Sequence, residues 1–154
     1  MLENAAELSD SYEFSEAIRI YDKILRVDPK NIGALIDKAV TLQRMGKNRK
    51  SLQLFDTVLE ISPKNVDALI GKGSILHALK KYDDAIKLYD IALKINKKFA
   101  LAYAYKGLSL GEKGEIKNAL GYFKKALSID KDLELASISK EAALKLLDSK
   151  KSKK

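Results

Sequence analysis

The chain has 154 residues, of which 46% are hydrophobic and 32% are charged, and its formal net charge at pH 7 is +8. It contains no cysteine and a single histidine, which excludes disulfides, thiolate chemistry and a typical zinc site. No apolar run approaches the ~20 residues of a membrane span, and the N-terminus is acidic where a secretory signal would be basic and then apolar. The composition therefore favours a cytoplasmic protein that needs no metal or other cofactor.

Apolar residues recur at helical spacing from the start of the chain, and the first 31 residues predict a shortened pair of helices. This segment holds 4 Lys or Arg against 7 Asp or Glu, so it carries a net −3 and the remainder carries +11, the difference between +8 and −3. Pro29 stops its second helix and Asn31 can cap the next one, an arrangement that Pro63 and Asn65 repeat. The segment lacks about three residues at its start relative to the later pairs, as in a chain cut from a longer protein.

Residues 32–65 and 66–99 each predict a complete pair of helices. The polar breaks within them, at 45–48 and 80–83, are so short that the two helices must run antiparallel. Gly46 falls where a first helix should end, a position that often requires a left-handed residue.

Residues 100–133 predict a third complete pair with Gly114 in its break, and residues 134–148 predict one further helix. Lys97 and Lys131 stand where a proline would end the pair. These two junctions are therefore less sharply specified by the sequence than the two that contain proline.

The same residue types return with a 34-residue period through these pairs. Gly73 and Gly107 recur in the middle of first helices, where glycine costs about 1 kcal/mol relative to alanine. Close helix crossing offsets that cost, and Tyr89 and Phe123 are the large counterparts between successive repeats. One window holds Lys72, Gly73, Leu76, Ala85, Tyr89, Ala92 and Leu93, and a shift by one period gives Lys106, Gly107, Leu110, Ala119, Phe123, Ala126 and Leu127.

These recurring positions resemble the tetratricopeptide repeat (TPR) family, whose 34-residue helix–turn–helix pattern is matched in register four times. One departure is lysine at 38, 72 and 106, where the family usually has leucine. The resemblance implies an all-α fold, a right-handed superhelical solenoid of antiparallel helix pairs closed by a capping helix. It predicts a single TPR domain over 1–148, with repeats at 1–31 (partial), 32–65, 66–99 and 100–133, a capping helix at 134–148 and a Lys-rich tail at 149–154.

The resemblance also implies a concave groove lined by the first helices of the repeats. The family's groove positions hold an apolar strip in this chain, which suits an amphipathic helix or an extended apolar peptide. The alternative is that these side chains pack on one another or on a neighbouring chain. The predicted ligand-binding residues are Ile36, Val40, Gln43, Ile70, Ser74, His77, Ala104, Tyr105 and Leu108. Asp37, Gly71, Gly111 and Glu112 are assigned to the same face.

Chaperone-binding members of the family hold a C-terminal carboxylate with a clamp of lysine, asparagine and arginine side chains. Carried onto this chain from the first repeat, the clamp positions are Leu2, Ala6, Asp37, Asp67 and Gly71. Carried over from the second, they are Ile36, Val40, Gly71, Leu101 and Tyr105. Neither set supplies a cation, so an acidic-tail chaperone clamp is not expected.

Lys38, Lys72, Lys106 and Lys140 form a ladder with the same period. We expect their aliphatic stems to pack at repeat borders and their ammonium groups to reach water. The alternative is a basic stripe that binds RNA or another anionic partner, but no aromatic or arginine-rich stacking platform accompanies it. The expected partner is therefore a protein or peptide, with self-association through exposed ends of the solenoid left open.

No residue constellation predicts an enzyme. Ser74 and His77 lie three apart on one predicted helix face, but neither an oxyanion site nor a nucleophile turn accompanies them. The function expected from the sequence is thus a non-catalytic scaffold for protein–protein interaction.

Overall fold

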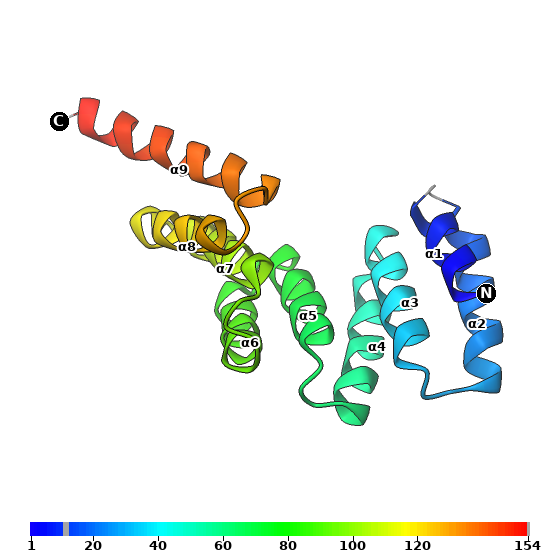
Figure 1. Cartoon of the computed structure of the whole chain (residues 1–154). Coiled ribbons are helices and arrows are strands. Elements are labelled where there is room, and N and C mark those ends of the chain that lie inside the picture. Colours follow the sequence, from blue (N-terminus) through cyan, green and yellow to red (C-terminus); the bar gives the residue numbers. More distant parts are fainter. Residues whose placement is uncertain (11–12, 154) are drawn as a thin grey trace. The chain divides into compact units, whose positions relative to one another are not determined.

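The computed structural model describes residues 1–10 and 13–153, and within them the chain forms nine α-helices and no strand (Figure 1). The helices belong to two compact units, Met1–Ile75 and Leu76–Lys154, called unit 1 and unit 2 below. The all-α class predicted from the apolar spacing is confirmed.

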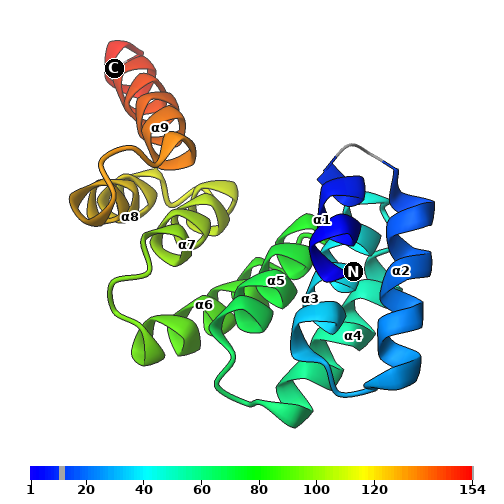
Figure 2. The ribbon, with the colours of Figure 1, turned by 45° about the vertical axis from the view of Figure 1, so that its right-hand side comes forward.

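Unit 1 contains four complete helices and most of a fifth. They are α1 (Leu2–Asp10), α2 (Phe14–Val27), α3 (Ile32–Arg44), α4 (Asn48–Ile61) and α5 (Val66–Ala78), whose last turn belongs to unit 2. Unit 2 continues with α6 (Tyr82–Ile95), α7 (Ala100–Glu112), α8 (Ile116–Ile129) and α9 (Glu134–Ser152). The last helix runs past residue 148 into the lysine-rich segment that was expected to be a tail (Figure 2).

The helix ends follow the turn chemistry of the sequence. Gly46 and Gly114 adopt positive φ, 74° and 86°, as predicted for residues that end first helices. Lys80 holds the equivalent place with φ 62°, although its side chain makes that conformation costly. The Asn31 and Asn65 side chains cap the next helices by accepting hydrogen bonds from backbone N–H groups three residues on, both at 2.9 Å.

The two junctions without proline are closed by a different device. The Asn96 side chain accepts a hydrogen bond from the backbone N–H of Lys98 at 3.0 Å, and Asp130 accepts one from Asp132 at 3.1 Å. These Asx turns fix the chain direction where the sequence lacks proline.

Close contact between a small residue and an aromatic ring sets the spacing of neighbouring helices. A Cβ atom built on Gly107 in α7 would lie 2.6 Å from the Phe123 ring in α8. A Cβ atom on Gly71 in α5 would overlap the Phe55 ring in α4. The close crossing predicted for Gly107 is confirmed, whereas Gly71, which the sequence assigned to the groove, faces the preceding second helix instead.

Ion pairs join first helices to the second helix before them. In unit 1, Lys38 lies 2.6 Å from Asp22 and Lys72 lies 2.6 Å from Asp56. In unit 2, Lys106 lies 2.6 Å from Asp90 and its side chain is only 14% exposed. The lysine stems pack at repeat borders as expected, but these ammonium groups meet carboxylates rather than water alone.

We expect Gly71→Ala to destabilise the protein by about 1–3 kcal/mol, because the added methyl group has no room beside Phe55. Gly121→Ala is the matched control, since a Cβ atom on this α8 residue would meet nothing within 4 Å. Alanine there should stabilise the protein by up to about 1 kcal/mol. Urea unfolding measures both changes, and equal effects of the two substitutions would contradict the close contact at Gly71.

A double-mutant cycle on Asp90→Asn and Lys106→Met should give a coupling free energy of about 0.5–1 kcal/mol, near the upper limit for exposed pairs, because this pair is partly shielded from water. The control is the Lys87–Asp84 pair, which spans 3.4 Å between side chains that are 74% and 59% exposed. Its coupling should be close to zero. A coupling at Asp90–Lys106 no larger than that of the control would show that the ladder does not hold the helices together.

Candidate functional site

The nine predicted ligand-binding residues differ widely in exposure, and the apolar members of the predicted strip are not all at the surface. Among them Val40 is 39% exposed, whereas Ile70 is 5% exposed and Ala104 is fully buried. The remaining six are partly buried. Ile70 and Ala104 therefore belong to the core, and neither offers a side chain to a ligand.

Three of the polar members are engaged within the protein. In unit 1 the Gln43 amide of α3 donates to the Ser74 hydroxyl of α5 at 2.9 Å. In unit 2 the Nδ1 atom of His77 lies 2.8 Å from the Ser109 hydroxyl of α7. Such bridges join successive first helices, so Gln43, Ser74 and His77 each already have a polar contact within the protein.

The bridge at the start of the chain follows the same rule. The Ser9 hydroxyl of α1 lies 2.8 Å from the Thr41 hydroxyl of α3, and both side chains are buried.

Burial lowers the pKa of His77 in the corresponding bridge of unit 2, and the nearby Glu112 carboxylate opposes that shift. His77 is thus neutral near pH 7 and bonds to Ser109 without the desolvation cost of a charge.

Tyr105 also has a structural contact. Its ring stacks on Tyr89 of α6 with centroids 5.9 Å apart, and burial raises the pKa of both hydroxyls. Tyr105 follows Gly71 by one repeat period. Each residue lies on a first helix and faces an aromatic ring of the second helix before it: Phe55 for Gly71 and Tyr89 for Tyr105. Leu108, another predicted residue of unit 2, lines a cavity.

That cavity opens between α7 and α9, has a volume of about 180 Å³, and lies entirely within unit 2. It is lined by Leu108, Gly111, Glu112, Ile116, Ala119, Phe123, Ser139, Ala142, Ala143 and Leu146. Gly111 and Ala143 stand one repeat period after His77 and Ser109, so the polar bridge of the preceding junction has no counterpart here. The space that a bridging side chain fills elsewhere remains open and mostly apolar.

An exposed apolar stripe on α9 is not among the residues predicted from the sequence. Ile138 is 60% exposed and Leu146 is 49% exposed, with the exposed Ala142 one turn from each. These residues follow Ala104, Leu108 and Glu112 by one repeat period, so extending that period into the capping helix would have found them. The cavity lined by Leu108, Gly111, Ala142 and Leu146, together with the adjoining Ile138, is called the α7–α9 groove below.

A larger cavity, about 520 Å³, lies in unit 1 and is lined by none of the nine predicted residues. Its walls come from α2, α3 and α4 and include the Lys38–Asp22 ion pair, Ile18, Leu42 and Leu54. Its lining also includes Lys47, Lys50 and Gln53, so this cavity is more polar than the α7–α9 groove.

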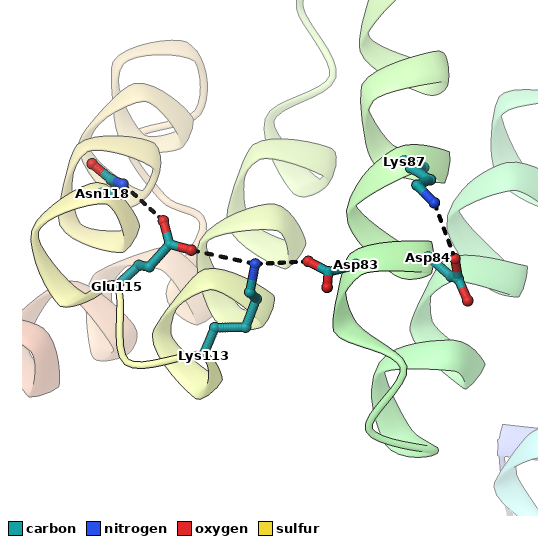
Figure 3. Close-up of polar contacts among 6 residues, drawn as sticks. All are labelled: Asp83, Asp84, Lys87, Lys113, Glu115 and Asn118. Atoms are coloured by element: carbon teal, nitrogen blue, oxygen red, sulfur yellow. Dashed lines mark hydrogen bonds and ion pairs between the residues drawn. The ribbon is translucent and has the colours of Figure 1, made fainter.

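Acidic and basic groups at the turns of unit 2 form a surface cluster (Figure 3). The Lys113 ammonium lies 2.6 Å from Asp83 and 3.3 Å from Glu115, whose carboxylate also accepts a hydrogen bond from Asn118. Hydrogen bonding to Lys113 lowers the pKa of Asp83, and its acceptors raise the pKa of Lys113. The cluster is exposed and internally paired, which is the arrangement of a surface salt-bridge network.

Among the described residues, no three His, Asp or Glu side chains gather in a geometry that could hold a metal ion. None of the described helices combines the length and apolar character needed to cross a bilayer.

Solved structures with the same fold include TPR proteins. The crystal structure of TTC0263, a thermophilic TPR protein in Thermus thermophilus, is 18% identical with a TM-score of 0.83, covering 96% of this chain and 83% of that one. A crystal structure of MamA protein is 24% identical with a TM-score of 0.72, covering 94% and 81%. The first TPR of Spaghetti (RPAP3) bound to the HSP90 peptide SRMEEVD is 17% identical with a TM-score of 0.71, covering 79% and 96%.

No curated protein matches the chain. Two family models do match: that of the Psidin N-terminal TPR repeats region over residues 4–104, and a tetratricopeptide repeat model over residues 82–134. The first covers more than half of the chain, and the solved structures share its all-α TPR fold. The chain therefore belongs to the tetratricopeptide repeat proteins.

Proposed function

We propose that the protein is a non-catalytic scaffold that binds an apolar peptide or one face of an amphipathic helix in the α7–α9 groove. The open junction between these helices carries the proposal, because the preceding junctions are bridged by polar side chains. An apolar cavity beside an exposed aliphatic stripe is a surface that a partner side chain can fill with a gain of hydrophobic free energy.

The shape of the groove favours insertion of an aliphatic or aromatic anchor. Gly111 leaves room at the cavity, since a Cβ atom built there would meet only the Ala119 methyl group, at 3.8 Å. Ile138, Ala142 and Leu146 follow one another at one-turn intervals along α9, which matches the anchor spacing of a helix laid alongside. Anchors on a bound helix would recur at similar intervals.

The charges of this chain argue against two other ligand classes. Acidic C-terminal peptides require cations at the clamp positions, where this chain has Leu2, Ala6, Asp37, Asp67 and Gly71. RNA would require a free basic stripe, whereas Lys38, Lys72 and Lys106 of the predicted ladder are each paired with an aspartate. We accordingly favour a protein partner, and a cytoplasmic setting suits a chain without cysteine.

Peptides selected from a random phage-displayed library against the wild-type protein should carry two or more aliphatic or aromatic anchors at helical spacing. Ile138→Glu should weaken their binding by at least about tenfold, because a charge would have to be buried at a hydrophobic contact. The 60% exposure of Ile138 makes this substitution compatible with a normally folded protein.

The matched control is Ile91→Glu, which introduces the same charge at a 43% exposed isoleucine of α6 outside the groove. Its effect on peptide affinity should stay within about twofold. Ile70→Glu, the substitution that the sequence alone would suggest, is unsuitable because Ile70 belongs to the core. If the selected peptides bind the Ile138→Glu and Ile91→Glu variants equally well, the α7–α9 groove is not their binding site.

A further inference from the structure

The lysine–aspartate ion pairs that recur between successive repeats are not continued at the border between α8 and α9. The paired acids are Asp22, Asp56 and Asp90, and their bases are Lys38, Lys72 and Lys106. Continuing both series by one repeat period gives Lys124 in α8, where an aspartate is due, and Lys140 in α9. The described residues offer neither of these two lysines an ion-pair partner within 4.0 Å.

Lys124 thus brings a second positive charge to the repeat position where the preceding borders have the aspartate of an attractive pair. Lys140 is partly buried, like the three lysines that have aspartate partners, while Lys124 is exposed. A carboxylate supplied from outside at this place would be attracted by both ammonium groups. At this border the lysine of the repeating pair is present as Lys140, but the aspartate partner is missing.

Apolar side chains accompany the two lysines. On α9, Leu144 and Leu147 follow Lys140 by four and seven residues and share its face. Leu144 holds the repeat position of Leu110, which is 8% exposed because α8 packs on it, yet Leu144 is 37% exposed.

Helix α8 contributes the other half of the surface. Lys117, Leu120 and Lys124 recur at three and four residues, so they lie on one face of the helix. A cavity of about 410 Å³ joins this face to α9, since its lining includes Lys117, Leu147 and Lys150. Glu115 also lines it, but that carboxylate is engaged by Lys113 and Asn118. Lys117, Leu120, Lys124, Lys140, Leu144 and Leu147 are together called the α8–α9 face.

We propose that the α8–α9 face binds an acidic amphipathic segment of a partner protein. One carboxylate of the segment takes the place of the missing aspartate between Lys124 and Lys140, and its apolar side chains lie on the exposed leucines. At about 100° per residue, Lys140 and the stripe of Ile138, Ala142 and Leu146 are on opposite sides of α9. This second surface is consequently independent of the α7–α9 groove.

The probe is a fluorescein-labelled, end-capped helical peptide of about 16 residues with leucines at i and i+4 flanked by glutamates. A second peptide has glutamine in place of every glutamate. Fluorescence anisotropy should show that the wild-type protein binds the glutamate peptide at least about tenfold more tightly than the glutamine peptide, since ion pairs at a partly desolvated surface carry the preference.

Lys124→Asp places an aspartate of the protein itself beside Lys140. Because this carboxylate takes the place proposed for a peptide carboxylate, binding of the glutamate peptide should weaken by about tenfold. The matched control is Lys23→Asp, which makes the same charge change at an exposed lysine of α2, another helix of 14 residues. The control should bind within about twofold of wild type. Ile138→Glu should also leave this affinity unchanged, which separates the α8–α9 face from the groove.

Thermal unfolding of the same variants gives a second readout. The carboxylate introduced by Lys124→Asp would pair with Lys140, so this variant should have a melting temperature about 1–3 °C above that of the Lys23→Asp control. Equal loss of peptide binding in the two variants would show that the peptide follows net charge, and the proposal would be wrong. Absence of binding to wild type, or a melting temperature below that of the control, would also overturn it.

Discussion

The close approach of a glycine backbone to an aromatic ring is the contact on which the remaining geometry depends. Gly107 meets Phe123 between α7 and α8, and Gly71 meets Phe55 between α4 and α5. Because helix spacing is fixed at these crossings, side chains one repeat period apart reach equivalent neighbours within each unit. The lysine–aspartate pairs and the polar bridges between first helices are consequences of that spacing.

The border with α9 departs from this scheme on two sides of one helix. On one side Gly111 and Ala143 leave a cavity where His77 and Ser109 form a bridge in the preceding junction. On the other side Lys124 replaces the aspartate of the ladder. This border therefore lacks two of the contacts that join the preceding helices, and it carries both proposed binding surfaces.

The repeat period predicted the fold and much of the turn chemistry, because buried small residues, caps and left-handed glycines leave direct marks in a sequence. It did not predict exposure at individual groove positions. Ile70 and Ala104 carry the residue types of a ligand strip yet lie in the core, and Tyr105 is held by a ring on another helix. The α9 stripe is harder to predict because residues 134–148 resemble a capping helix, although Ile138 continues the period.

The most direct test of a partner site at the last junction is a map of amide chemical shifts for the ¹⁵N-labelled protein during titration with a library-selected apolar peptide. The account predicts that the largest changes fall on α7 and α9, at Leu108, Gly111, Ala142 and neighbouring amides. Changes centred on Val40 and the polar bridge of Gln43 and Ser74 in unit 1 would contradict it.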